Sequence, residues 1–342
     1  MNILKQIMIL GLGLFVLSCQ HKKKINFLIL PSPRESTISE KFSLIAPRDL
    51  ILAYSPTNNP LPKLFNFTKT LQKTEKEGQA QVSFQINEDL DLPDQGYFLN
   101  IAEKRITIEA KDNAGLFYGF TTLDQITEDA VLQGVNLPLV QIKDYPELTY
   151  RSVHWDVKHH LDKEAYYYDL IDKMSRQKIN GVILEIEDKL KYHSHPNIGS
   201  ADAFSSKQWL AISEYANERH ISISPLVQGL GHASFILKHP RYFELRDDPV
   251  SDWAFNPLNP KTYEVQFDLY DEAISITPYG KYLHVGGDEV KTTGRNSGQS
   301  ALELQLYWLN KVAKYAQKNN RIPIFWDDMP LKEAGLMDPI YD

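Results

Sequence analysis

From Tyr150 onward, the chain alternates between short apolar runs and segments in which apolar residues recur at helical spacing. The apolar runs predict strands near residues 151–157, 182–186, 221–228, 281–285 and 323–326. Helices are predicted between them, near residues 163–177, after Ser205, after Asn259-Pro260 and near residues 300–319. We expect Asn180-Gly181 to end the first of these helices. Strands that alternate with helices indicate parallel βαβ units, and therefore an α/β fold.

Residues 20–145 follow a different pattern. Apolar positions at 97–101 and 105–110 predict the two strands of a β-hairpin. Asp112 is a candidate N-cap for the helix that should follow. No reactive side chains cluster in this region, so we interpret it as a small noncatalytic α/β domain that serves as a scaffold.

Polar and aromatic residues gather at or just past the ends of the predicted strands. These groups are Asp156 with Lys158, residues 185–188, Gln228 with His232, Asp288 with Glu289, and residues 326–328. In a (β/α)8 barrel the active site lies at this C-terminal face of the sheet. An open doubly wound sheet follows the same rule but usually carries a glycine-rich phosphate loop in its first unit, and this sequence has none. We therefore expect residues 146–342 to form a (β/α)8 barrel of the TIM type, preceded by the small α/β domain.

The acid pair at the end of the fourth predicted strand is the strongest chemical signal. Neighbouring side chains in a regular strand point to opposite faces, so two acids meant for one pocket need the strand to end or distort. Gly286 and Gly287, directly before Asp288 and Glu289, permit that distortion. Two carboxylates placed in this way suit acid–base chemistry on a sugar. The alternative is a strand and turn that carry two solvated acids.

Charge and targeting signals limit the possible partners and location. A net charge of −7, without a dense basic stripe, argues against nucleic acid as a partner. Residues 1–19 combine a cation at Lys5 with an apolar stretch over 7–17, which predicts a targeting segment outside the fold. The sequence Val16-Leu17-Ser18-Cys19 contains the only cysteine and resembles the lipobox of bacterial lipoproteins. The resemblance implies a lipid anchor at Cys19, and thus a membrane-attached protein of the bacterial cell envelope; an ordinary secretory signal is the alternative.

The acid-pair motif and three further strand-end motifs together resemble glycoside hydrolase family 20, the β-N-acetylhexosaminidases. In chain order these motifs are Arg151-Ser-Val-His-Trp-Asp156, Gly231-His232-Ala233, His284-Val-Gly-Gly-Asp288-Glu289 and Trp326-Asp327-Asp328-Met329. Residues 178–188 and 225–239 are similar to the hexosaminidase D branch in particular. The resemblance covers residues 150–330. A weaker similarity over 25–145 points to the noncatalytic domain that precedes family-20 barrels.

This resemblance implies a hydrolase that removes terminal β-linked N-acetylgalactosamine or N-acetylglucosamine from glycans, without a cofactor or a metal. In the family's retaining mechanism, the 2-acetamido oxygen of the substrate attacks the anomeric carbon and gives an oxazolinium intermediate. Glu289 would protonate the leaving oxygen and then activate water, while Asp288 would hold the acetamido group and stabilise positive charge. The implied substrate-binding residues are Lys158, Glu185, Glu187, Asp188, Gln228, His232, Trp326 and Asp327.

Other roles stay open for several of these residues. Glu185 and Glu187 alternate along one strand, so they could both point into the barrel mouth, or they could form a structural ion pair with Lys158. His232 could be a structural histidine, and Trp326 could fill the core. At the level of the whole protein, one alternative is a lipid-anchored glycan-binding protein with an inactive or partial catalytic fold. Another is a hydrolase whose acid pair supplies a direct nucleophile.

Three further features bear on these expectations. His193 and His195 would share one face of an extended segment, a spacing compatible with a metal site, but they precede Pro196 in a predicted loop. The arginine that classic family-20 enzymes carry after the first strand falls at His159 here, next to Lys158. The sequence ends near where a sixth strand would begin, so we expect a barrel that is incomplete at its C-terminus. Either a longer protein or a partner chain would then complete it.

Overall fold

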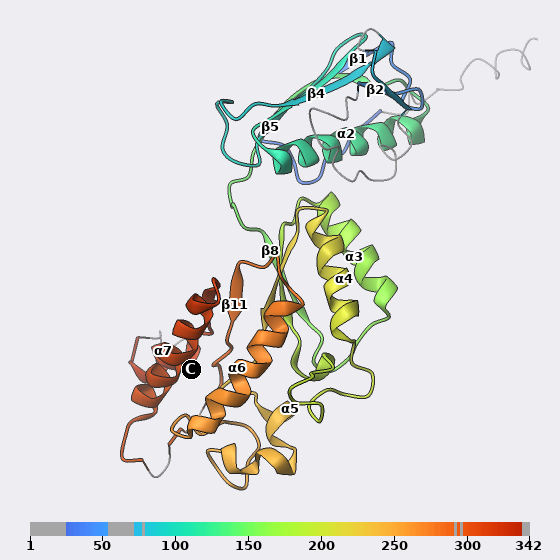
Figure 1. Ribbon diagram of the computed structural model, residues 1–342. Helices are drawn as coiled ribbons and strands as arrows, with labels where there is room; N and C mark the ends of the chain where they lie inside the picture. The colour runs from blue at the N-terminus through green and yellow to red at the C-terminus, as the bar shows by residue number, and fades with distance from the viewer. Residues whose placement is uncertain (1–24, 54–71, 77–78, 291–292, 295–296, 337–342) are drawn as a thin grey trace, which may run out of the picture.

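The computed structural model describes residues 25–53, 72–76, 79–290, 293–294 and 297–336, which form two domains joined near residue 146 (Figure 1). The predicted targeting segment, with Cys19, lies outside the described residues. None of the helices in the described ranges is long and apolar enough to cross a membrane.

Within the described residues, the N-terminal domain is a mixed sheet of seven strands with one long helix across a face (Figure 1). Helix α2 (Asn113–Gln133) begins as predicted, because the Asp112 side chain accepts a hydrogen bond from the Gly115 N–H at 2.7 Å. The predicted hairpin is confirmed as the antiparallel pair β5–β6, whose alternate residues are buried in a core with α2. The strand order is β1 (Glu35–Phe42), β7 (Pro138–Asp144), β5 (Tyr97–Ile101), β6 (Ile106–Ala110), β4 (Val82–Ile86), β2 (Ile51–Ala53) and β3 (Gln72–Thr74).

The second domain, called the parallel domain below, confirms the predicted alternation of strands and helices. Its described strands are all parallel and lie in chain order, with β8 and β12 at the edges of the sheet. They are β8 (Ser152–Asp156), β9 (Gly181–Glu185), β10 (Ser222–Leu226), β11 (Tyr282–His284) and β12 (Ile322–Ile324). The intervening and following helices are α3 (Glu164–Arg176), η3 (Glu187–Lys189), α4 (Ser206–Asn217), α5 (Ser234–Leu237), η4 (Pro240–Leu245), α6 (Pro260–Ser275), α7 (Ala301–Lys318) and α8 (Asp328–Glu333).

Helix α3 ends at Arg176, within one residue of the prediction, but the residues expected to terminate it, Asn180-Gly181, are not the ones that do so. Lys178, two residues past the helix, has a φ of 57° and takes the left-handed position that Asn180-Gly181 was expected to supply. The Ile179 N–H then donates to a carbonyl of the last helical turn, which closes a Schellman motif. Gly181 instead opens β9, where the Tyr150 ring lies so close that an added Cβ would overlap it. That glycine is therefore explained by packing and not by helix termination.

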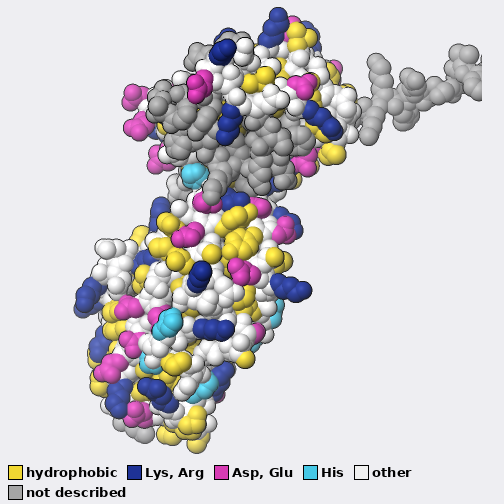
Figure 2. All heavy atoms as spheres, turned by 45° about the vertical axis from the view of Figure 1, so that its right-hand side comes forward, with side chains coloured by type: hydrophobic (Ala, Val, Ile, Leu, Met, Phe, Trp, Pro, Cys, Tyr) yellow, Lys and Arg dark blue, Asp and Glu magenta, His cyan; other side chains and the backbone are white. Residues whose placement is uncertain are grey.

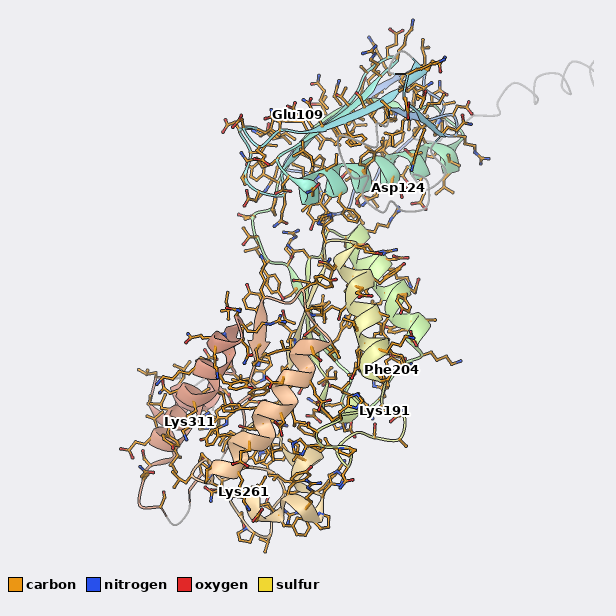
Figure 3. The ribbon with its side chains drawn as sticks, viewed as in Figure 1. Glu109, Asp124, Lys191, Phe204, Lys261 and Lys311 are labelled. Atoms are coloured by element: carbon orange, nitrogen blue, oxygen red, sulfur yellow. The ribbon has the colours of Figure 1, made fainter. Side chains whose placement is uncertain are left out.

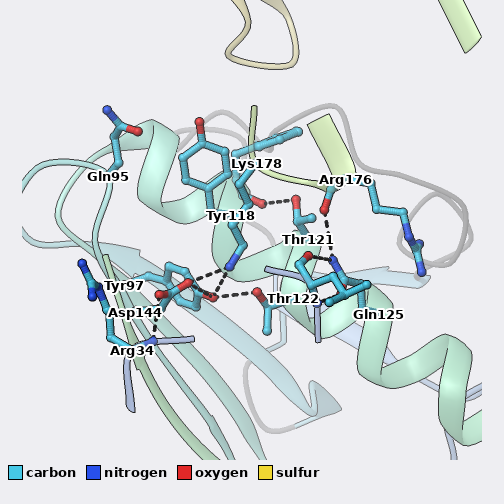
Figure 4. Close-up of polar contacts among 12 residues, drawn as sticks. Arg34, Gln95, Tyr97, Tyr118, Thr121, Thr122, Gln125, Asp144, Arg176 and Lys178 are labelled. Atoms are coloured by element: carbon cyan, nitrogen blue, oxygen red, sulfur yellow. Dashed lines mark hydrogen bonds and ion pairs between the residues drawn. The ribbon is translucent and has the colours of Figure 1, made fainter. Parts of the chain in front are cut away.

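The two domains meet at the end of the parallel sheet where its strands begin (Figure 1), and Figure 4 shows polar contacts between them. Lys178 reaches into the N-terminal domain, where its ammonium lies 2.6 Å from an Asp144 carboxylate oxygen and donates to Tyr97 Oη at 2.9 Å. Burial lowers the pKa of Lys178, and the Asp144 charge opposes that effect. Arg176 pairs at 3.2 Å with Asp124, on the side of α2 that faces the parallel domain (Figure 3). The end at which the parallel strands finish therefore faces away from the N-terminal domain.

The parallel domain has a core of its own between the sheet and the helices. Trp209 on α4 and Trp308 on α7 are fully buried in it. Most charged side chains lie on the outside, and Glu185 and Glu187 are buried exceptions. On the face shown in Figure 2, basic and acidic side chains are interspersed, so that face carries charge of mixed sign.

Candidate active site

The chain distorts directly after β11, as the sequence predicts. Gly286 and Gly287 have φ values of 74° and 100°, in the region that favours glycine. A Cβ added to Gly286 would also overlap the Gln228 side-chain oxygen, so both the backbone and the space require glycine there. The turn places Asp288 and Glu289 side by side at the end of the sheet. Their side chains are 23% and 62% exposed.

His232, from the loop after β10, lies against both carboxylates. Its Nε2 is 3.2 Å from Asp288 Oδ2 and 3.5 Å from Glu289 Oε2. The Asp288 carboxylate, 3.2 Å away, is the largest cause that raises the pKa of His232; burial opposes it and the charge of Glu289 adds to it. A Cβ on Gly231 would lie 2.5 Å from the Asp288 carbonyl oxygen, so this glycine permits the close approach of the two loops. The Gly-His motif and the acid pair thus form one cluster.

A second, buried carboxylate lies at the end of β9. Glu185 is 3.0 Å from Lys158 Nζ and 2.9 Å from His154 Nε2, and it accepts a hydrogen bond from Gln228 Nε2 at 2.9 Å. Burial alone would raise the pKa of Glu185, but these hydrogen bonds and the Lys158 charge outweigh it and lower the pKa to about 2. Of the two roles considered for Glu185, its contacts in the free protein are those of an ion pair with Lys158.

Glu187 does not lie on the same strand face as Glu185, which corrects the prediction from alternation. β9 ends at Glu185, and Glu187 lies in η3 with a φ of 37°. The side chain is still buried, and burial followed by the Glu185 charge raises the pKa of Glu187 to about 8. Asp188 is also half-buried and lies 3.4 Å from Lys189 Nζ. The turn therefore brings an uncharged acid close to the ionised Glu185.

Trp326 lies after β12, on the other side of the acid pair from His232. Its ring centroid is 4.6 Å from that of His284 and 6.0 Å from that of His154, the latter in a stacked arrangement. Trp326 is 37% exposed, so part of its ring is open to a ligand. Burial lowers the pKa of His284 to about 4, and its Nδ1 accepts a hydrogen bond from the Gly286 N–H. Trp326 thus presents a partly exposed ring that packs against the neutral imidazole of His284.

Two residues that the sequence analysis did not select also contact the acid pair. Trp253 donates from its indole N–H to the Glu289 carbonyl oxygen at 3.1 Å, and its ring centroid is 4.4 Å from that of His232. Asp328 accepts a hydrogen bond from the Glu289 N–H at 3.4 Å, whereas the predicted ligand Asp327 is exposed at the start of α8. Asp328 stands in the same motif as Asp327, so the sequence contained that signal. Trp253 lies in a segment without regular secondary structure, and no feature of the sequence pointed to it.

Of the two histidines considered for a metal site, His195 has other side-chain partners: its ring lies 2.9 Å from Tyr242 Oη and 3.1 Å from Asp268 Oδ2. His193 contacts Glu272 through its backbone N–H, which donates at 2.7 Å. In the part of the chain that the structure describes, no group of three or more His, Cys, Asp or Glu side chains could hold a metal ion.

Comparison with protein families gives two matches in chain order. The models described as "Glycosyl hydrolase family 20, domain 2" and "Glycosyl hydrolase family 20, catalytic domain" match residues 29–145 and 148–339. A beta-hexosaminidase of Porphyromonas gingivalis is 26% identical over 93% of this chain and 47% of that protein. Hexosaminidase D of Bos taurus is 28% identical over 52% of this chain and 55% of that protein. The chain spans about half the length of these relatives.

Solved structures share the fold. A beta-N-acetylhexosaminidase from Bacteroides fragilis is similar with a TM-score of 0.72 and 22% identity, covering 88% of this chain and 66% of that chain. An exo beta-N-acetylglucosaminidase from Vibrio harveyi, solved with N-acetylglucosamine, has a TM-score of 0.71 and 19% identity over 89% of this chain and 56% of that chain. An N-terminal mixed sheet followed by a parallel β/α domain is therefore an arrangement that this chain shares with known enzymes.

Proposed function

The chain belongs to glycosyl hydrolase family 20, the β-hexosaminidase family, and on that premise we propose that the protein removes terminal β-linked N-acetylhexosamine from glycans. The proposed reaction retains configuration and is assisted by the substrate, whose 2-acetamido oxygen attacks the anomeric carbon. The observation that carries the proposal is the pair Asp288 and Glu289 at the end of β11, held against His232 at 3.2 and 3.5 Å. The preferred sugar is N-acetylgalactosamine or N-acetylglucosamine.

The different exposure of the two acids supports different roles. Glu289 is 62% exposed, so it can reach the glycosidic oxygen, protonate it as the bond breaks, and then take a proton from water. Asp288 is only 23% exposed and lies beside His232, deeper in the site than Glu289. Its Oδ1 is buried without a hydrogen-bond partner among the described residues. An acetamido N–H of the substrate would satisfy this acceptor and place the acetamido oxygen under the anomeric carbon.

The remaining pocket groups would recognise the sugar. Trp326 would provide the wall beneath the ring that is cleaved off. Gln228 donates to Glu185, but its own side-chain oxygen is buried without a partner in the described part of the chain, so it can accept from a sugar hydroxyl. Lys158, beside Glu185, would replace the arginine of classic family-20 enzymes. Glu187, Asp188 and Asp327 would be the remaining sugar ligands.

We also propose that the parallel sheet is part of a (β/α)8 barrel. The described strands are parallel and in chain order, and the family structures contain further chain that this one does not cover. The β12 edge supports the idea, because Ile322 and Phe325 are 56% and 45% exposed there. Additional strands, from the same polypeptide or from a partner chain, would cover that edge. Lipidation at Cys19 would anchor the protein in the bacterial cell envelope.

Hydrolysis of three nitrophenyl glycosides by the full-length native protein tests the proposed function. We expect release of nitrophenol from the β-N-acetylgalactosaminide or the β-N-acetylglucosaminide and none from the plain β-galactoside, which lacks the attacking acetamido group. Glu289→Gln should lower kcat at least about 100-fold with little change in KM, because it removes proton transfer and keeps binding.

Cleavage of the plain galactoside would contradict substrate assistance and favour a direct nucleophile. Binding of N-acetylhexosamine without cleavage of any substrate would instead support the glycan-binding alternative. Mass spectrometry of the membrane fraction, with Cys19→Ala as control, tests the anchor: an unlipidated wild-type protein would refute it.

A further inference from the structure

Two half-exposed tryptophans flank the acid pair from opposite sides. The sheet order is β12-β11-β10, so Trp326 after β12 and Trp253 in the loop after β10 stand on the two sides of the chain that follows β11. Each is 37% exposed. A glycosidase handles two sugars at once: the one it cleaves off and the one that leaves. Trp326 is the proposed wall for the first, and the proposed mechanism gives Trp253 no role.

The contacts of Trp253 place it beside the proton donor. Its indole N–H donates to the carbonyl oxygen of Glu289, and its ring lies against His232, whose Nε2 is 3.5 Å from the Glu289 carboxylate. Glu289 protonates the glycosidic oxygen in the proposed reaction, and the leaving sugar is attached to that same oxygen. The leaving sugar must therefore lie next to Glu289, on the side away from Trp326.

The segment that carries Trp253 is held firmly in place. The Trp253 carbonyl accepts a hydrogen bond from the Ala233 N–H at 2.9 Å, and the Phe255 N–H donates to the Leu230 carbonyl at 2.8 Å. The Ser234 hydroxyl donates to the main chain of the preceding residue, Asp252, at 3.2 Å. A ring presented by a fixed backbone loses little conformational freedom when a ligand binds it.

We infer that Trp253 forms the floor of a leaving-group subsite, where its indole stacks against the apolar C–H face of the pyranose on the far side of the scissile bond. The preferred ligand class is thus a β-linked di- or oligosaccharide, whose second sugar occupies this subsite. This inference rests on the proposed function, because it assigns the leaving-group side from the role of Glu289. Stacking withdraws one face of the sugar and the exposed part of the indole from water, which favours binding.

Calorimetric titration of the full-length Glu289→Gln protein separates this subsite from catalysis. The two ligands share the cleaved sugar: a methyl β-N-acetylhexosaminide, and the β-linked disaccharide of two N-acetylhexosamines. We expect the disaccharide to bind about tenfold more tightly, the effect of burying one sugar face. Adding Trp253→Ala should remove that advantage. Trp253→Phe should keep most of it, because the ring remains and only the N–H is lost.

Tyr279→Ala serves as the control, since Tyr279 is 43% exposed and lies before β11, at the opposite end of the sheet. It should leave both affinities unchanged. A disaccharide advantage that survives Trp253→Ala would overturn the subsite. Equal losses for both ligands in the Ala and Phe variants would also overturn it, because they would assign Trp253 to holding Glu289 through its N–H. Failure of the parent protein to bind either ligand would refute the proposed function itself.

Discussion

Replacement of Glu187 by glutamine is expected to stabilise the protein at alkaline pH and to change its stability little at acid pH. Burial, and then the charge of Glu185, raises the pKa of Glu187 from 4.5 to about 8. Between those values the folded protein holds a proton that the unfolded chain has lost, so unfolding releases a proton and stability falls as the pH rises. The loss is about 1.4 kcal/mol per pH unit and reaches about 5 kcal/mol by pH 8.

Urea unfolding followed by tryptophan fluorescence, between about pH 2 and pH 9, measures this effect and that of the control below. The informative quantity is the free energy of unfolding of Glu187→Gln minus that of the wild type. It should be close to zero at the acid end and rise through the interval between the two pKa values, because glutamine has no proton to lose. Above the higher value it should stay constant, since Glu187 is then ionised in both the folded and the unfolded protein. Taking the difference removes the contribution that the other titrating groups, shared by the two proteins, make to the pH dependence of the free energy of unfolding.

Glu185→Gln provides a matched control of opposite sign, two residues away. The pKa of Glu185 is lowered from 4.5 to about 2, so its ionised form stabilises the folded protein above the higher value. That stabilisation, about 3 kcal/mol, is lost as the pH falls towards the lower value. Glu185→Gln should therefore weaken the protein at neutral pH and approach the wild type in acid. A Glu187→Gln difference that does not vary between pH 5 and pH 8 would refute the argument that burial keeps Glu187 protonated.

Two further predictions concern the domain contact and the β11 turn. Lys178→Met should lower the free energy of unfolding by about 3–5 kcal/mol, because it leaves the Asp144 carboxylate buried without its cation; an unchanged unfolding midpoint would contradict this. Gly286→Ala should cost more than the 1–2 kcal/mol of a left-handed alanine, since its Cβ also overlaps Gln228. Gly298→Ala is the control, with the same φ of 74° and open space around it. Unfolding and nitrophenol release are measured for both glycine variants. If Gly286→Ala and Gly298→Ala lose the same free energy of unfolding, the role of the overlap is refuted.

Helix starts could be predicted from the sequence because the signals that make them are local. Asp112, Ser205 and Asn259 each cap the helix that follows them, and each donor they satisfy lies within three residues. Helix ends were harder to locate. Lys178, His220 and Asn320 take the left-handed position after α3, α4 and α7 without being glycine. The recurring signal is a polar residue one or two positions before the isoleucine that leads into the next strand.

The site could be predicted only as far as the strand order determines it. Parallel strands in chain order bring their C-terminal ends together, so the grouping of Glu185, Gln228 and Asp288 followed from the alternation alone. The contacts within the site depend on loop conformations, which leave no periodic pattern in the sequence. Glu187 turned away from the strand face because its backbone is left-handed, and Trp253 reaches Glu289 from a long irregular segment. Neither effect has a signature in hydrophobic spacing.

Left-handed residues concentrate where this site needs side chains to converge. Glu187, Leu230, His232 and Glu289 have φ values between 37° and 63°, and they follow three neighbouring strands. Each such residue other than glycine costs about 1–2 kcal/mol, so the fold must offset several kcal/mol at one end of the sheet. A regular continuation of β11 would send Asp288 and Glu289 to opposite faces, and only a reversal of the chain lets both approach His232. The strain is therefore tied to the convergence of the proposed catalytic groups, and a sequence selected for stability alone would not keep it.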